Sequence, residues 1–402
     1  MKITVAVFFG GKSTEHEVSV ITGLQAFAAI DRDKYAPIPL YITKDNTLYT
    51  GDAAGDIAEY SDISGLLNKS KAVTIIDRKL YEVTAKKADL RKPLASIDIA
   101  LPCVHGTNVE DGALQGFLEM QGIPYAGCDV LSSAVGMDKA VQKAVLRQFA
   151  DIPMLDCVAF TAKQYIENKG AVLGEVTDKI GLPAILKPMN LGSSIGIKIA
   201  KTQSDLPDAI EHALLFADRI IAERAVTNLR EINCSVLGDK DSAQASECEE
   251  PLGSGEILDF NDKYKSGGKS GRGGKSSAKS GGMASLKRKI PADISPERRE
   301  EIRAMAVKAF KALGCAGVAR IDFLIDCDSD SVYFNEINTI PGSMSFYLWE
   351  AVGMSYPKLL DKLFTLALKR EREKQNLTFS FESNILSAFK GGFGGSKSGG
   401  KS

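Results

Sequence analysis

Over the first 131 residues, short apolar runs rich in β-branched residues alternate with longer segments in which apolar residues recur at helical spacing. Short apolar runs bounded by glycine or polar residues are typical of buried strands, and the longer segments are typical of amphipathic helices. We predict strands at 3–9, 36–42 and 97–104 and helices at 17–30 and 112–121. This alternation predicts an α/β N-terminal domain, at 1–131, with a parallel sheet.

The pattern changes after residue 131. A predicted helix at 139–149 is followed by two short strands, 184–187 and 196–200, which are joined by a glycine–serine turn. Two strands joined by a turn predict a small antiparallel hairpin module and not a second βαβ unit. We therefore expect a separate central domain at 132–222.

A third pattern begins near residue 223 and continues to about residue 371. Ser295 followed by proline is a typical helix start. The elements that we expect here are strands at 232–237, 318–325 and 332–335 and a helix at 296–313. They predict a C-terminal domain at 223–371, which leaves an extra segment at 372–402.

The composition is that of an ordinary globular protein. The 402 residues are 44% hydrophobic and 25% charged, and this length allows two or three domains. The formal net charge of −1 excludes a polycation that binds nucleic acid through its overall charge. No apolar run approaches the ~20 residues of a membrane helix. The apolar start leads directly into a glycine turn, so we interpret it as a first strand and not as a signal sequence.

The seven cysteines are scattered among apolar residues and form no C-x-x-C pair. This usage is typical of reduced core thiols in a cytoplasmic protein. The chain has only three histidines, which leaves little material for a histidine metal site.

Two segments rich in glycine, serine and lysine, 265–282 and 390–402, cannot bury a core. We interpret both as solvated linkers. The first is strongly basic, but no aromatic side chain is interleaved with its charges, so it offers no stacking surface for nucleic acid.

Glu15 and His105 each follow a predicted strand, in the segments FGGKSTEHEVS (9–19) and HGTNVEDG (105–112). Ligands of α/β sheets bind at the carboxyl ends of the strands, and the backbone N–H groups beside His105 suit an anionic group. Other interpretations stay open: Glu15 can complement a helix dipole, and His105 can be a buried polar residue beside a capped helix.

Lys187 begins the segment KPMNLGSSIG (187–196). The amides and hydroxyls of its glycine–serine turn could fold over phosphates. The segment is no P-loop, because the lysine precedes the glycines and no helix follows. A plain hairpin turn is the alternative.

Arg320 and Asp322 lie on one face of a predicted strand, and Glu336 and Asn338 share a face of the next one. Carboxylate and amide oxygens that face each other are costly to bury unless a hard cation lies among them. This set therefore predicts Mg²⁺ that bridges nucleotide phosphates.

Taken together, these motifs resemble the D-alanine–D-alanine ligases of the ATP-grasp superfamily. The resemblance runs in order from residue 3 to about residue 365, and its motifs are Gly10-Gly11 with Glu15, the segment 105–112, Met137-Asp138-Lys139, the segment 187–196, Arg320-Ile321-Asp322 and the segment 335–342 (NEINTIPG). It implies an α/β N-terminal domain, a small central domain and a C-terminal domain, with ATP held between two antiparallel sheets.

The resemblance also implies roles for single residues. The implied nucleotide-binding residues are Lys139, Lys187, Ser193, Ser194, Glu223, Glu231 and Lys263. The implied metal ligands, for two Mg²⁺ or Mn²⁺ ions, are Asp322, Glu336 and Asn338. The implied catalytic residues are Glu15, Ser193, Tyr264 and Arg320, and the implied substrate-binding residues are Glu15, His105, Gly342, Tyr347 and Leu348.

The activity implied is the ATP-dependent joining of two D-alanines through an acyl phosphate, which supplies peptidoglycan precursors. The resemblance also implies a cytoplasmic enzyme and a homodimer. The segment after Tyr264 corresponds to the lid of the family (260–289), here with the basic insert 265–282. The run 343–349 (SMSFYLW) is bulkier than we expect beside the second substrate. Two alternatives are a ligase that uses D-serine, D-lactate or another amino acid, and a nucleotide-binding regulatory protein. The intact set of charged residues disfavours the regulatory protein.

Overall fold

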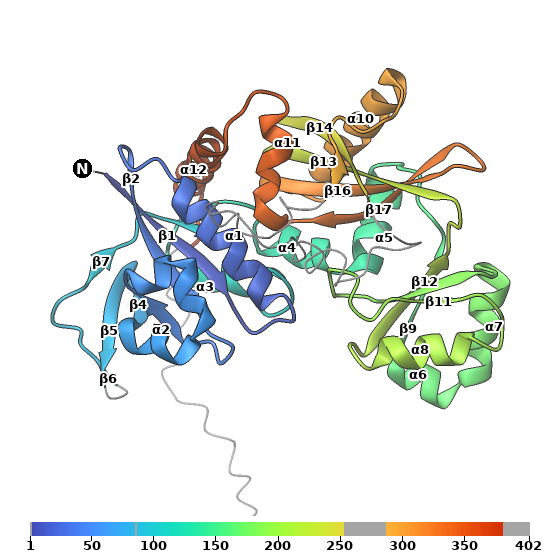
Figure 1. Cartoon of the computed structure of the whole chain (residues 1–402), viewed down its shortest axis with the longest axis horizontal. Helices are drawn as coiled ribbons and strands as arrows, with labels where there is room; N and C mark the ends of the chain where they lie inside the picture. The colour runs from blue at the N-terminus through green and yellow to red at the C-terminus, as the bar shows by residue number, and fades with distance from the viewer. Residues whose placement is uncertain (1, 85–86, 253–286, 381–402) are drawn as a thin grey trace, which may run out of the picture.

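The computed structural model describes residues 2–84, 87–252 and 287–380. It contains three sheets, and Figure 1 shows the N-terminal sheet at the left, the central sheet at the lower right and the C-terminal sheet between them, toward the top. Within the described ranges, no helix is long and apolar enough to cross a membrane. The predicted residues Lys263 and Tyr264, the insert 265–282 and the tail 390–402 lie outside the described residues.

The N-terminal sheet has eight strands in the order β6-β5-β4-β3-β2-β1-β8, with β7 paired to β5. The strands are β1 (Ile3–Gly10), β2 (Tyr35–Ile42), β3 (Leu48–Thr50), β4 (Lys71–Ile76), β5 (Lys79–Thr84), β6 (Lys87–Ala88), β7 (Ala95–Ser96) and β8 (Ile99–Pro102). The helices are α1 (His16–Ala29), α2 (Ile63–Lys69), α3 (Ala113–Met120) and the 3₁₀ helices η1 (Ala53–Gly55) and η2 (Ile57–Ser61). Only β2, β1 and β8 pair in parallel, as predicted. The antiparallel strands between residues 48 and 96 were not predicted, because they are short and carry many polar residues.

The central sheet has four antiparallel strands in the order β11-β10-β12-β9. Its elements are β9 (Cys157–Thr161), α6 (Ala162–Glu167), α7 (Lys169–Lys179), β10 (Ala184–Pro188), β11 (Lys198–Ala200), α8 (Leu206–Leu214) and β12 (Arg219–Arg224). The hairpin that we predicted is β10 and β11, which pair from Ala184 with Ala200. The sheet is larger than that hairpin because α7 and α8 bury apolar residues against it, among them Val176, Leu206 and Ile210.

The C-terminal sheet has five antiparallel strands in the order β15-β14-β13-β16-β17. Its strands are β13 (Leu229–Gly238), β14 (Ala243–Pro251), β15 (Arg288–Lys289), β16 (Gly317–Asp326) and β17 (Ser331–Asn338). The helices that follow or accompany them are α4 (Val130–Met137), α5 (Lys139–Phe149), α10 (Pro296–Ala312), η4 (Gly342–Ser345), α11 (Phe346–Glu350) and α12 (Tyr356–Gln375). Ser295 caps α10 by accepting a hydrogen bond from the Arg298 backbone N–H, as its sequence predicts.

Strand alternation gives the C-terminal sheet two different faces. On β16, Ile321 and Phe323 belong to the same core cluster as Phe310 of α10. Arg320 and Asp322, the intervening polar residues of that strand, therefore belong to the opposite face.

The packing crosses the predicted domain boundaries. Strand β12 continues to Arg224, past the boundary at 222. Leu146 of α5 lies in the core of the C-terminal sheet, although the predicted ranges assign α5 to the central domain. Helix α12 continues past residue 371, and its residue Phe364 lies in the core of the N-terminal sheet.

All seven cysteines are free. Five are buried, as expected for core thiols, Cys157 is half-buried, and Cys327 is exposed because it follows the end of β16.

Candidate functional site

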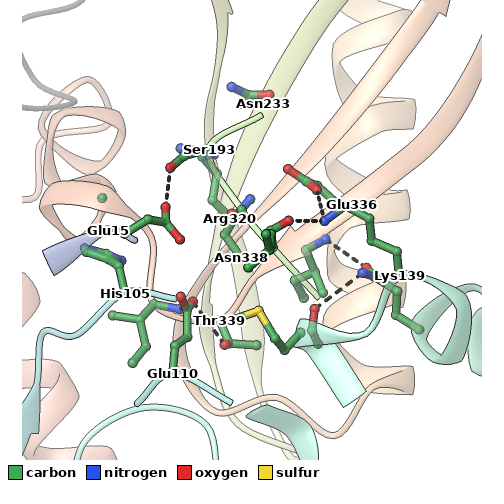
Figure 2. A pocket seen from close by; sticks show the side chains of 18 of the residues that line it. Glu15, His105, Glu110, Lys139, Ser193, Asn233, Arg320, Glu336, Asn338 and Thr339 are labelled. Carbon is green, nitrogen blue, oxygen red and sulfur yellow. Dashed lines mark hydrogen bonds and ion pairs between the residues drawn. The ribbon is translucent and has the colours of Figure 1, made fainter. Parts of the chain in front are cut away.

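Two adjoining cavities lie where the sheets meet. The larger, of about 290 Å³, has apolar walls from both the central and the C-terminal sheets, including Ile185, Ile199 and Leu324. The smaller, of about 60 Å³, is lined by polar residues from all three parts of the chain (Figure 2). Lys139, Glu231 and Glu336 line both cavities, so the two spaces share a wall of charged side chains.

A buried triad of charges forms part of the wall of the larger cavity. The Glu223 carboxylate, which is 1% exposed, lies 2.6 Å from the Lys143 Nζ and 2.6 Å from the Lys187 Nζ. Burial alone would raise the pKa of Glu223, but the two lysine charges outweigh it and lower this pKa to about 2. Glu223 therefore stays ionised at neutral pH, between two lysines and beside a cavity with apolar walls.

Lys143 is not among the predicted site residues. It lies one helical turn after Lys139 on α5, so the two lysines share a helix face. Both are buried, and the Lys139 Nζ donates to the Leu191 carbonyl at 2.6 Å and lies 3.2 Å from the Glu336 carboxylate. Two lysines spaced four residues apart on a helix are the sequence signal that could have identified this face.

The strands β16 and β17 hold the predicted metal ligands opposite one another. Their register pairs Arg320 with Asn338 and Asp322 with Glu336. The Arg320 guanidinium donates two hydrogen bonds of 2.7 Å to the Asp322 carboxylate. The Asn338 side-chain amide donates to the same carboxylate at 3.0 Å. Burial raises the pKa of Asp322 to about 6 despite the Arg320 charge.

The chemistry of these donors fits a hard cation that also takes phosphate oxygens. Asp322, Glu336 and Asn338 supply two carboxylates and one amide, and the amide nitrogen of Asn338 is already used for Asp322, which leaves its oxygen as the possible ligand. Within the described residues, no group of three or more His, Cys, Asp or Glu residues is arranged for a metal ion.

Glu15 and Ser193 meet across the smaller cavity although they lie in different domains. The Ser193 hydroxyl donates a hydrogen bond to the Glu15 carboxylate (Figure 2). Glu15 occupies the N-cap position of α1, but its side chain makes no capping hydrogen bond to that helix. Gly106 and Gly192 allow this approach, because a Cβ atom would lie 3.1 Å or 3.0 Å, respectively, from the Glu15 Oε2.

His105 lines the smaller cavity but is also held by the protein. Its backbone N–H donates to the Ser19 hydroxyl at 2.8 Å, and its Nε2 lies 2.9 Å from the Thr22 hydroxyl oxygen. Burial lowers the pKa of His105 to about 4, and the nearby Arg320 charge acts in the same direction. The ring is therefore neutral at neutral pH and can contact a ligand as a polar group but not as a cation.

Glu110 joins the N-terminal domain to the loop that follows β17, and it is not among the predicted site residues. Its carboxylate accepts hydrogen bonds from the Gly106 and Ile340 backbone N–H groups, each at 3.0 Å, and from the Thr339 hydroxyl at 3.4 Å (Figure 2). Burial, with the nearby charge of Glu15, raises the pKa of Glu110 to about 8. The residue fixes the loop between Asn338 and Gly342.

Tyr347 lies in a second polar cluster that includes two unpredicted residues, Glu249 and Arg288. The Tyr347 hydroxyl donates to the Glu249 carboxylate at 3.2 Å, and the Arg288 guanidinium lies 3.9 Å from the centre of the Tyr347 ring. Gly342, which is predicted to bind substrate, lines the smaller cavity. Leu348, predicted as a substrate contact, has no exposed surface.

The remaining predicted residues divide between the two cavities. Ser194, Lys187, Glu223 and Glu231 line the larger cavity, while Ser193, Glu231 and Asn338 line the smaller one.

Comparison with known proteins gives consistent matches over nearly the whole chain. The family models described as D-ala D-ala ligase N-terminus and D-ala D-ala ligase C-terminus match residues 4–128 and 146–365. The D-alanine–D-alanine ligase of Thermosipho melanesiensis is 36% identical over 384 residues, which cover 96% of this chain and 98% of that protein. The enzyme of the same name from Caldicellulosiruptor bescii is 38% identical, with 95% and 99% covered.

Solved structures agree. The D-alanine–D-alanine ligase of Coxiella burnetii superimposes with a TM-score of 0.75 at 30% identity, covering 93% of this chain and 97% of that one. A D-Ala:D-Ser ligase from Enterococcus faecalis gives a TM-score of 0.73 at 29% identity, covering 91% and 100%.

Proposed function

The chain belongs to the D-alanine–D-alanine ligase family, and from this premise we propose that it joins two D-alanines into D-alanyl-D-alanine with ATP as the energy source. The two antiparallel sheets beside the larger cavity form the ATP-grasp fold of that family. The observation that carries the assignment to this site is the convergence of Glu15, Ser193 and Arg320, from three separate parts of the chain, on one cavity.

ATP occupies the larger cavity in this proposal. The apolar walls suit the adenine ring, and Lys139 and Lys187 supply positive charge for the phosphates. Glu231, which lines both cavities, is proposed to bind the ribose hydroxyls, and Ser194 to contact the phosphates. Glu223 acts mainly through Lys187, because its carboxylate is already committed to two lysines.

The two D-alanines occupy the smaller cavity. Glu15 binds the ammonium group of the first D-alanine, and Ser193 orients Glu15. The carboxylate of this D-alanine attacks the γ-phosphate and gives an acyl phosphate and ADP. The amine of the second D-alanine, once its ammonium group has lost a proton, then attacks the acyl carbonyl, and Arg320 with the Gly342 amide stabilises the oxyanion that forms. Collapse of the oxyanion breaks the carbon–oxygen bond to phosphate, which leaves as inorganic phosphate, and the nitrogen releases a proton to give the peptide bond.

Asp322, Glu336 and Asn338 are the proposed ligands for two Mg²⁺ or Mn²⁺ ions. Bound there, the ions would spread the negative charge of the nucleotide phosphates. Arg320 orients Asp322 through its two hydrogen bonds, so removal of Arg320 is expected to impair both the oxyanion site and the metal ligand.

The acceptor that we propose is D-alanine, with D-serine as the second choice and D-lactate disfavoured. This preference rests on Tyr264, a neutral side chain at ordinary pH, where a cationic residue would attract the lactate anion. Both Tyr264 and Lys263 lie outside the described residues. On the family basis we further propose that the enzyme is a cytoplasmic homodimer that supplies peptidoglycan precursors.

The test is a coupled assay of ADP release from MgATP with a panel of D-amino acids, L-alanine and D-lactate, with the products identified by mass spectrometry. We expect ADP release to require a D-amino acid, with D-alanyl-D-alanine as the main product. ADP release without any amino acid, or the absence of dipeptide, would contradict the proposed ligation. More D-alanyl-D-lactate than D-alanyl-D-alanine at equal acceptor concentrations and neutral pH would contradict the acceptor preference.

A further inference from the structure

Arg288 is a cation of the smaller cavity that the proposed reaction steps leave without a role. It lies on the edge strand β15, next to Pro251 of β14, and its side chain is 9% exposed. It lines the cavity together with Arg320 and Gly342, the groups that we assign to the reacting carboxyl. Its guanidinium therefore carries a positive charge into the space where the two amino acids meet.

Three cations from the described part of the chain line this cavity: Lys139, Arg288 and Arg320. Lys139 also lines the nucleotide cavity and contacts Glu336. Arg320 directs two of its donors to Asp322. Arg288 differs from both, because it forms an ion pair with Glu249, which is no metal ligand in our assignment.

The guanidinium of Arg288 is held in one orientation by its neighbours. The Glu249 Oε2 accepts a hydrogen bond of 2.5 Å from the Arg288 Nη1, and the Tyr347 ring packs against the guanidinium plane at 3.9 Å. The other Glu249 oxygen accepts from the Asn233 amide at 3.3 Å and from the Tyr347 hydroxyl at 3.2 Å. Glu249 thus fixes both the cation and the ring beside it, so that little side-chain entropy is lost when a ligand binds.

We propose that Arg288 binds the carboxylate of the acceptor amino acid and that Glu249 and Tyr347 position it for this purpose. The inference rests on the proposed ligation and adds the specificity of its second substrate. The acceptor carboxylate does not react, so it needs a fixed partner apart from the ATP phosphates. A planar guanidinium matches the geometry of a carboxylate. The Arg288–Glu249 pair is neutral overall, which suits a zwitterionic acceptor better than the net anion D-lactate.

A competition between two acceptors tests the inference. The full-length enzyme receives MgATP, D-alanine and an equal concentration of D-alaninamide, which has the attacking amine but no carboxylate. Mass spectrometry gives the ratio of D-alanyl-D-alanine to D-alanyl-D-alaninamide. Both products arise from the same acyl phosphate, so the ratio depends on neither ATP binding nor overall activity. The difference in amine basicity between the acceptors is the same for every variant and cancels.

We expect Arg288→Met to lower this ratio by about 10- to 100-fold, as expected for loss of a charge-assisted hydrogen bond. Arg288→Lys, which keeps the charge but loses the planar group, should lower it by less, and this milder variant serves if the first does not fold. Arg230→Lys is the control, because Arg230 of β13 is also an arginine paired with a glutamate of β14, Glu250, but does not line the smaller cavity. Its ratio should equal that of the wild type.

A ratio within about twofold of the wild-type value in folded Arg288→Met would overturn the role of Arg288 while leaving the ligase assignment intact. If the wild-type enzyme makes neither product, the proposed function itself is wrong. The two failures are therefore distinguishable in one assay.

Discussion

Glu223 in the wall of the nucleotide cavity and Glu110 beside the substrate cavity are both buried carboxylates, yet their pKa values shift in opposite directions. Burial raises the pKa of each. At Glu223 two lysines reverse that effect and lower the pKa to about 2. At Glu110 the donors are neutral groups and the nearest charge is the like charge of Glu15, so the pKa is about 8.

The difference shows how each cavity is built. The nucleotide wall places opposite charges on regular elements, α5, β10 and β12, and these keep Glu223 ionised at neutral pH. The substrate wall consists partly of two loops, one in the N-terminal domain and one after β17. Glu110 of the first loop joins them through its hydrogen bonds. The charge of Glu110, which holds two loops through uncharged donors, therefore changes with pH near neutrality. The charge of Glu223, which lies between two lysines, does not.

The largest expected effect is at the metal face that borders both cavities. Asp322→Ala and Glu336→Ala should each reduce turnover by at least about 100-fold, because the developing phosphate charge is left uncompensated. Measurement of ADP release with D-alanine present checks this. Asp326→Ala is the control, since Asp326 is on the same strand but contacts Arg224 and the Asp328 backbone. Turnover close to the wild-type rate in Asp322→Ala or Glu336→Ala would contradict the assignment of these residues as metal ligands.

The next effect is on stability and separates the two glutamates directly. Glu223→Gln leaves two buried lysines without their counter-charge and should lower the free energy of unfolding by about 3–5 kcal/mol. Glu110→Gln keeps a hydrogen-bond acceptor and breaks no ion pair, so at pH 6 it should cost about 1–3 kcal/mol. Guanidinium chloride unfolding of both variants measures the difference. Equal losses would mean that the lysines near Glu223 contribute little.

A third prediction uses pH to sharpen the same contrast. Glu110 has an ordinary pKa of 4.5 in an unfolded chain and a pKa of about 8 when folded, so between these values the folded protein holds a proton that the unfolded chain has released. Its contribution to stability is therefore complete below about pH 4.5 and is lost as the pH rises through 8. Glu110→Gln should make the melting temperature less dependent on pH between 6 and 9. Parallel profiles for wild type and variant would show that Glu110 does not titrate in this range.

The smallest effect is expected at Ser193. Ser193→Ala removes one hydrogen bond to Glu15 and should raise the KM for D-alanine by less than about tenfold, with the KM for ATP almost unchanged. Initial-rate kinetics with each substrate varied in turn provide the test. An equal rise in the KM for ATP would show that Ser193 contributes mainly to the nucleotide cavity.

Sequence reasoning succeeded where local pattern determines placement. Strand alternation puts Arg320 and Asp322 on one face of their strand and Glu336 and Asn338 on one face of the next strand, and the register brings the two pairs together on the same face of the sheet. The N-terminal prediction was less complete, because strands such as Leu48–Thr50, with three residues, are too short to show a period.

The residues that sequence reasoning missed depend on contacts between distant segments. Glu110 is 230 positions from Ile340, so no local pattern relates them. Nothing in the local sequence distinguishes Lys143 from a surface lysine, and its burial depends on the distant Glu223 of the central sheet, with which it forms an ion pair. Arg288 lies at the end of a basic segment, and the sequence does not distinguish it from the lysines and arginine of that segment, which are typical of solvent-exposed residues.

Helix α12 has a consequence for synthesis on the ribosome. Its residues Leu360 and Phe364 lie in the same core as Val5 and Phe8 of the first strand, and the Phe364 ring packs 4.8 Å from that of Tyr35. The first domain to emerge therefore exposes an apolar face until the last helix has been translated. Contacts of such long sequence separation form late and slowly. A nascent chain that ends before residue 356 should consequently need chaperones and be sensitive to proteases.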